Sequence, residues 1–141
     1  MEYTDISLNL SNIFQKYPIF FGYIFGSFGT SRETSLSDID IAVYINQDYD
    51  KYKRFKLRLE LLNILEKELY PKHVDLIILN DSPIILNYDI ITKGSVIYQK
   101  SKQARLQFEQ KALKFYFDFK PFSDKFNEYK KLLFLKEQSH G

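Results

Sequence analysis

The sequence predicts a mixed α/β (α+β) domain in which a short β-sheet is flanked by helices. Short apolar runs with strand character alternate along the chain with longer stretches whose apolar residues recur at helical spacing. No internal repeat, low-complexity segment or linker interrupts the 141 residues, which suit one hydrophobic core. We therefore expect a single domain over residues 1–141, with a C-terminal helical segment over about 101–137.

The first elements are a helix and two strands. Apolar residues from Ile6 to Tyr17 recur at helical spacing, with Asp5 as the expected cap and Pro18 as the stop. A strand over 19–25 follows and ends at a Gly-Ser turn. After a polar stretch, a second strand alternates strictly. One face carries Ile39, Ile41, Val43 and Ile45, and the other carries Asp38, Asp40, Ala42 and Tyr44.

The middle of the chain predicts a long helix, a strand and a short helix. The long helix ends before Pro71. Its expected buried stripe is Phe55, Leu59, Leu62, Leu65 and Leu69. The strand over 74–79 is apolar except for Asp75, and 96–98 has the pattern of a short edge strand. Ser82 and Pro83 are expected to open the short helix, and Gly94 to close it.

The last third is rich in aromatic residues. A helix from Ala104 to Phe119 is expected to break at Pro121, and a further helix to follow it. The aromatic residues occupy more than one helical face, so one core stripe cannot bury them all. Two interpretations stay open: they form an interface with a partner, or the last two helices pack on each other and on the sheet.

Five basic residues lie at the start of this segment: Lys100, Lys102, Arg105, Lys111 and Lys114. They could attract ATP or an acidic partner, but such residues more often form the solvated face of a helix.

Composition excludes several classes of function. The net charge of +2 is too small to indicate DNA binding, so no direct nucleic-acid contact is expected. The absence of cysteine excludes disulfides, thiolate zinc sites and cysteine nucleophiles. No apolar segment is long enough for a membrane span, and the N-terminus lacks the basic start of a signal peptide. We therefore expect a cytoplasmic protein with no membrane contact.

Three carboxylates carry the strongest chemical signal. Asp38 and Asp40 share one face of a strand, and Asp75 begins another apolar strand. Carboxylates in such surroundings need a positive partner, and Mg²⁺ prefers oxygen ligands. The Gly26-Ser27 turn, ten residues before Asp38, can approach and hold phosphate oxygens. Alone, the turn or the Asp-x-Asp pair would be ordinary surface structure; together they indicate phosphoryl-type transfer.

These residues resemble the nucleotidyltransferase superfamily related to DNA polymerase β. Its signature is Gly-Ser, ten residues, Asp-x-Asp, and a third Asp on a later strand. Here it reads GSFGTSRETSLSDID and later HVDLIIL. The chain is most similar to the minimal nucleotidyltransferases, the MNT family. The segments SPIILNYDIITKGSVIYQ and ALKFYFDFKP resemble later parts of MntA-type antitoxins, which are encoded beside a HEPN-domain ribonuclease toxin.

The resemblance implies a nucleotidyltransferase fold and an antitoxin that transfers AMP from ATP to a tyrosine of its HEPN partner. It also implies that Asp38, Asp40 and Asp75 hold two Mg²⁺ ions and form the catalytic set. Gly26 and Ser27 would then bind the phosphates of ATP.

One part of the signature differs from the family pattern, which commonly has Ala-Arg-Gly shortly after Gly-Ser. This chain has Gly29-Thr30-Ser31, and the nearest arginine is Arg32. We expect Arg32 or Lys93 to act near the triphosphate in its place. Two other functions stay open: an inactive relative that neutralises a toxin by binding alone, and a small-molecule nucleotidyltransferase.

Overall fold

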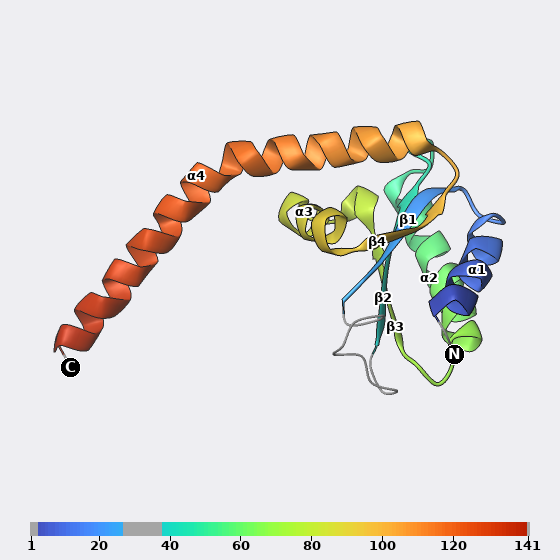
Figure 1. The fold of residues 1–141 in the computed structure, drawn as a ribbon, viewed down its shortest axis with the longest axis horizontal. Helices are drawn as coiled ribbons and strands as arrows, with labels where there is room; N and C mark the ends of the chain where they lie inside the picture. Colours follow the sequence, from blue (N-terminus) through green and yellow to red (C-terminus); the bar gives the residue numbers. More distant parts are fainter. Residues whose placement is uncertain (1–2, 27–37, 141) are drawn as a thin grey trace.

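The computed structural model describes residues 3–26 and 38–140, which form a four-stranded mixed sheet with helices on both faces (Figure 1). The elements in chain order are α1 (Tyr3–Phe14), β1 (Ile19–Phe25), β2 (Ile39–Ile45), α2 (Lys51–Glu68), β3 (Val74–Ile78), the 3₁₀ helix η1 (Leu79–Asp81), α3 (Ile84–Lys93), β4 (Ser95–Gln99) and α4 (Lys102–His140). The strand order is β3-β2-β1-β4. Only the β2–β3 pair is parallel. The expected fold class is confirmed.

The main core lies between the sheet and the pair α1 and α2, which cover one face (Figure 1). The predicted apolar face of β2 points into it, and all four of its members are buried. Strands rich in β-branched residues pack well on such a half-buried surface. Other buried members, from both helices and from the other strands, include Ile6, Leu10, Phe14, Leu61, Leu65, Val74, Leu76 and Ile97.

The opposite face of the sheet is divided between a second, aromatic cluster and the acidic residues. Phe21 on β1 stacks on Tyr44 of β2, with ring centroids 5.0 Å apart, and Phe108 of α4 lies 5.4 Å from Phe21. The other buried members of this cluster are Tyr23, Ala42, Leu79 and Ile90 of α3. It fixes α3 and the first turns of α4 over this face, and the carboxylates lie at the end where β2 and β3 begin.

Most predicted boundaries shift by a few residues. Helix α1 begins at Tyr3, before Asp5, so Asp5 is not its cap. Strand β3 stops at Ile78 because the chain turns into η1. The residue that caps α3 is Pro83 rather than Ser82, whose hydroxyl bonds Leu79 and Asn87 instead. Gly94 closes α3 as expected, and its N–H donates to the carbonyl of Ile90.

The predicted buried stripe of α2 is wrong in part. Phe55 and Leu59 are 56% and 49% exposed, whereas Leu61 and Leu65 are buried. This helix carries leucines in several phases, so more than one stripe fits a helical period. The observed stripe uses steps of four residues, and Leu62 packs only partly against it.

The predicted break at Pro121 is also wrong, because α4 runs unbroken past it to His140. Proline removes one backbone hydrogen bond and crowds the preceding turn, which usually ends or bends a helix. Here α4 bends and continues away from the sheet (Figure 1). Pro121 is exposed, so water can reach the carbonyl that has lost its donor. None of the described helices is both long and apolar enough to cross a membrane.

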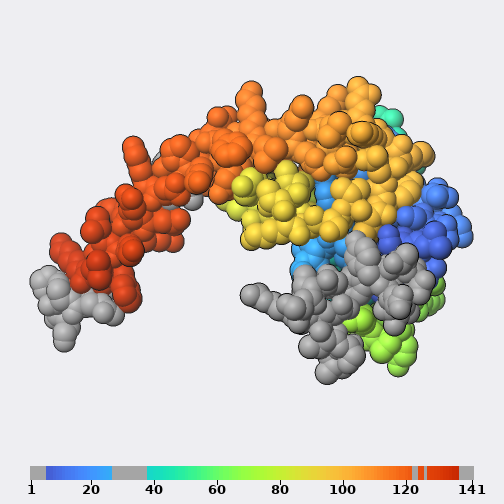
Figure 2. Space-filling view, in the orientation of Figure 1, coloured from blue at the N-terminus to red at the C-terminus, as the bar shows by residue number. Residues whose placement is uncertain are grey.

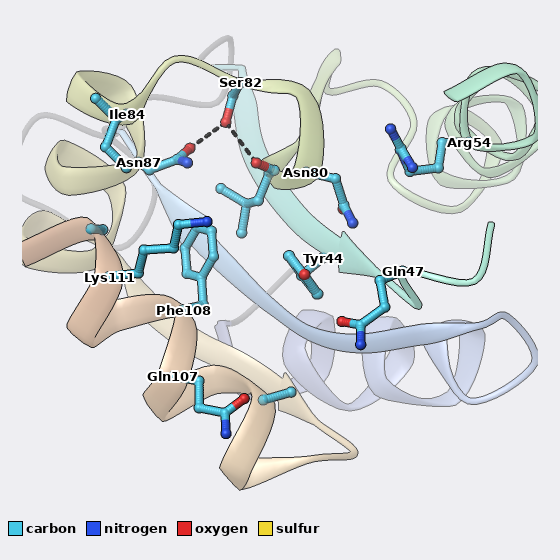
Figure 3. A pocket seen from close by; sticks show the side chains of 13 residues that line it. Tyr44, Gln47, Arg54, Asn80, Ser82, Ile84, Asn87, Gln107, Phe108 and Lys111 are labelled. Atoms are coloured by element: carbon cyan, nitrogen blue, oxygen red, sulfur yellow. Dashed lines mark hydrogen bonds between the residues drawn. The ribbon is translucent and has the colours of Figure 1, made fainter. Parts of the chain in front are cut away.

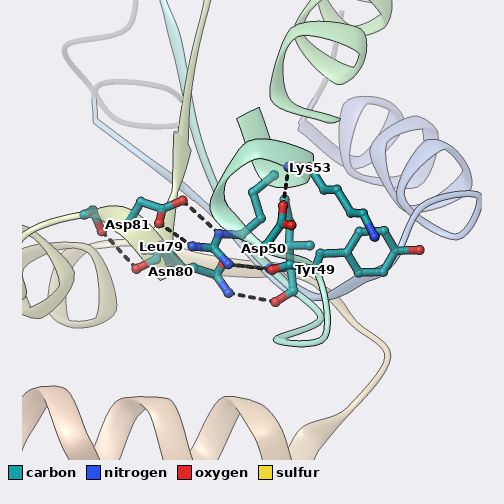
Figure 4. A network of polar contacts seen from close by, with 9 residues as sticks. Tyr49, Asp50, Lys53, Leu79, Asn80 and Asp81 are labelled. Carbon is teal, nitrogen blue, oxygen red and sulfur yellow. Dashed lines mark hydrogen bonds and ion pairs between the residues drawn. The ribbon is translucent and has the colours of Figure 1, made fainter. Parts of the chain in front are cut away.

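A polar network holds the end of the sheet farthest from the acidic residues (Figure 4). Arg54 of α2 makes two bonds to the Asp81 carboxylate, of 2.7 and 3.0 Å, and a third, of 2.6 Å, to the carbonyl of Tyr49. Asn80 accepts from the N–H of Ile45 and donates to its carbonyl, at 2.9 and 2.8 Å. The network therefore fixes the turn after β3 against the end of β2.

Candidate active site

The acidic residues meet at the edge of the sheet where β1 ends and β2 and β3 begin (Figure 1). The parallel pairing aligns Asp40 with Asp75, and the antiparallel pairing aligns Asp40 with Phe25. Asp38 comes directly before β2 and is exposed, as is Asp75. The topology thus brings Asp75 close to Asp38 and Asp40, although 35 positions separate it from Asp40. We call the site formed by these three carboxylates the acidic corner.

Gly26 closes the corner from the side of β1. Its φ of +80° is a conformation that side chains disfavour, and a Cβ here would overlap the Asp40 carboxylate. Gly26 was expected to approach phosphates. The nearby Asp40 carboxylate is a second reason why only glycine fits at this position. This contact follows from the register between β1 and β2, which the sequence does not show.

Two other predicted nucleotide-binding residues, Ser27 and Arg32, lie outside the residues that the structure describes. The alternative cation, Lys93, is exposed and forms a 3.7 Å ion pair with Asp89 one turn earlier on α3. This pair engages Lys93 on its own helix, while the adjacent Gly94 lies against Ile24 and Phe25 at the end of β1.

The corner carries an excess of negative charge. Burial raises the pKa of Asp40 above its ordinary value, and the nearby carboxylates of Asp75 and Asp38 raise it further. Asp40 is the half-buried member, so it loses most hydration while facing two like charges. A cation bound here would relieve this repulsion.

The carboxylates fit a magnesium site that is completed by a substrate. Within residues 3–26 and 38–140, no three acidic or histidine side chains are grouped tightly enough to hold one ion. Mg²⁺ is usually held by one or two carboxylates together with substrate phosphates and water, rather than by an all-protein cage. The donors at this corner are all hard carboxylate oxygens, as that arrangement requires.

Comparison with known families agrees with this geometry. The family model described as "Polymerase beta, Nucleotidyltransferase" matches residues 9–103, which include β1, β2, β3 and all three aspartates. The chain belongs to this nucleotidyltransferase family. Among curated proteins, none matches the chain significantly.

Several solved structures share the fold of this nucleotidyltransferase. A toxin–antitoxin structure with AMP-PNP aligns at a TM-score of 0.73 and 22% identity, covering 89% of this chain and 98% of the other. The complex of tri-AMPylated Shewanella oneidensis HEPN toxin with MNT antitoxin aligns at 0.66 and 20%, covering 91% and 98%. A MntA–HepT toxin–antitoxin structure aligns at 0.65 and 20%, with the same coverage.

Proposed function

We propose that this nucleotidyltransferase is an antitoxin that transfers AMP from ATP to a tyrosine hydroxyl of a HEPN ribonuclease toxin. The observation that carries the proposal is the alignment of Asp40 with Asp75, next to Gly26. These residues lie in the part of the chain that matches the nucleotidyltransferase family model. The relatives of similar fold support the choice of reaction. They include a toxin–antitoxin structure with AMP-PNP and an MNT antitoxin in complex with a tri-AMPylated HEPN toxin.

In the proposed site, the carboxylates bind metal and the turn after β1 binds phosphate. Asp38, Asp40 and Asp75 would hold two Mg²⁺ ions, and Gly26 with Ser27 would receive the phosphates. Bound Mg²⁺ would neutralise phosphate charge and assist ionisation of the acceptor, whose ordinary pKa is about 10. The tyrosine oxygen then bonds to the α-phosphorus as the bond to the β-phosphate breaks. Pyrophosphate leaves, and the phenol proton passes to solvent water.

The outer half of α4 is the proposed surface for the toxin. Tyr129, Leu132 and Phe134 are 60%, 65% and 58% exposed, although their side chains are large and apolar. This part of the helix projects beyond the sheet and the other helices (Figure 2). Large exposed apolar side chains are typical of interfaces. Of the two interpretations of the aromatic segment, this placement favours an interface.

The decisive experiment incubates the protein with α-labelled ATP, Mg²⁺ and the HEPN protein encoded beside it. We expect label on the toxin, on tyrosine, and none with Asp40→Asn. A stable complex without label would instead support an antitoxin that acts by binding alone. Label on a small molecule but not on the toxin would support the third function and contradict the proposal.

A further inference from the structure

A second, distinct cavity lies at the opposite end of the sheet face that carries the acidic residues (Figure 3). Its volume is about 520 Å³, within the range of small-molecule sites. Tyr44 contributes to its wall, four residues along β2 from Asp40, which corresponds to about 13 Å in a strand. The buried cluster of Phe21, Tyr23 and Ile90 lies on the same face, so the cavity is separate from the acidic corner.

Asn87 anchors the wall of this cavity. Only 5% of it is exposed, and it is the one buried polar residue among those that the structure describes. The hydroxyl of Ser82 donates to its Oδ1, which leaves Nδ2 toward the cavity (Figure 3). Among the described residues, no buried side-chain nitrogen or oxygen lacks a hydrogen-bond partner, so Nδ2 lies open to the cavity. No described residue accepts from Nδ2, so that donor is available to a ligand.

The charge of the lining is positive. Arg54 and Lys111 contribute cations, and none of the thirteen lining residues is an aspartate or glutamate. Arg54 is already neutralised by Asp81 at 2.7 Å. Lys111 has no ion pair or hydrogen bond to any described residue, and its side chain points from α4 into the cavity (Figure 3). One unneutralised cation therefore lies beside the free Asn87 donor.

The remaining lining suits a flat ring. Tyr44 and Phe108 form an aromatic wall, with ring centroids 5.5 Å apart and planes inclined by 54°. The carboxamides of Gln47 and Gln107 lie at the other side of the opening and can donate or accept. An apolar wall with a few convergent polar groups is the usual composition of a ligand site.

We propose that this cavity binds a small organic anion, in which a phosphate or carboxylate is joined to a flat ring. The anion would contact the Lys111 ammonium and Asn87 Nδ2, and the ring would lie against Tyr44 and Phe108. The site does not depend on the proposed transferase activity, because none of these residues belongs to the acidic corner.

The test is an NMR titration of the full ¹⁵N-labelled chain in EDTA, which removes the metal that the acidic corner would need. The probes are AMP, benzoate and inorganic phosphate. We expect AMP or benzoate to shift the side-chain amide signals of Asn87 and Gln107. A response to AMP alone identifies phosphate as the anionic group, and one to benzoate alone identifies carboxylate. Inorganic phosphate, which lacks a ring, should bind at least about tenfold more weakly.

Matched variants make the result decisive. Lys111→Met should weaken binding at least about tenfold, because it removes the only free cation of the lining. Lys102→Met, on the same helix but outside the cavity, should leave binding unchanged, as should Asp40→Asn. Both lysines are exposed, so neither change should disturb the fold. The proposal is overturned if neither ringed probe shifts these signals, or if Lys111→Met binds as the wild type does.

Discussion

The phenol of Tyr23, on β1, donates a 2.6 Å hydrogen bond to Oε1 of Glu109, on α4, 86 positions away in the chain. Arg105 donates to the same oxygen at 2.9 Å. Tyr23 is buried, and burial together with this bond raises the pKa of its phenol. The contact ties the base of the long helix to the centre of the sheet.

Tyr23→Phe should therefore loosen α4 at its base. Removing the hydroxyl loses one hydrogen bond, while Glu109 keeps its bond to Arg105. We expect a loss of about 0.5–1.5 kcal/mol in the free energy of unfolding, measured by urea denaturation. Tyr129→Phe, at an exposed site on the same helix, serves as the control and should change little. An equal loss in both variants would contradict this role.

Asp40→Asn should remove transferase activity and stabilise the metal-free protein. The raised pKa of Asp40 means that the folded state holds its proton more tightly than the unfolded chain does. Stability therefore falls as the pH rises from the ordinary value of 3.8 through the raised one, and the penalty is complete above it. In EDTA at pH 7 the variant should melt a few degrees higher than the wild type. Below pH 3.8 this difference should disappear.

Gly26→Ala should impair the site through its backbone. A side chain at φ +80° costs about 1–2 kcal/mol, and the new Cβ would displace the Asp40 carboxylate. We expect lower thermal stability and a loss of AMP transfer of at least about tenfold. Ser95→Ala, at the exposed start of β4, provides the control. Full transfer by Gly26→Ala would show that the contact with Asp40 is unimportant.

Asp81→Asn should destabilise the protein at neutral pH but not in acid. The bonds from Arg54 are the main reason that the pKa of Asp81 is lowered. The stabilising contribution is complete above the unfolded value of 3.8 and is lost as the pH falls through the lowered one. Because the pair is partly exposed, we expect a cost of only about 1 kcal/mol in urea unfolding at pH 7. A cost that persisted in strong acid would rule out the ion pair as its cause.

Tyr129→Asp combined with Leu132→Asp should weaken toxin binding without affecting the fold. Both side chains are more than half exposed, so charge there should leave the melting temperature nearly unchanged. We expect at least about a tenfold loss of affinity for the HEPN partner in calorimetry. The double variant Asn127→Asp and Lys131→Gln lowers the net charge of the same segment by the same two units and tests for a purely electrostatic effect. Unchanged affinity in the first variant would exclude this surface as the interface.

The acidic residues could be predicted from the sequence because one periodicity and one exception to an apolar run indicate them. Alternation along β2 separates Ile39 and Ile41 from Asp38 and Asp40, and the structure keeps that separation. The single carboxylate in an apolar strand marked Asp75. Its alignment with Asp40 depends on the parallel register between β2 and β3, which no pattern within either strand contains.

Other features depend on tertiary context that no local pattern contains. The phase of the α2 stripe is set by how the helix lies on the sheet, so Leu61 is buried where Leu59 was expected. Pro121 is tolerated because α4 is exposed at that point. The burial of Asn87 could not be predicted from the sequence, because it arises only when α3 and α4 enclose the cavity. The roles of the individual site residues, the single-domain boundary and the cytoplasmic location stay predictions.

Because α4 is one continuous helix of 39 residues, its tip is positioned by its base. At about 1.5 Å per residue, the part from Phe108 to the end of the helix is roughly 48 Å long along its axis. A tilt of one degree where Phe108 meets the sheet would displace the far end by about 0.8 Å. Small changes in side-chain volume at the base would thus be amplified at the tip. Substitutions where α4 meets the sheet can therefore change the direction in which its outer half points, without altering any residue of the outer half.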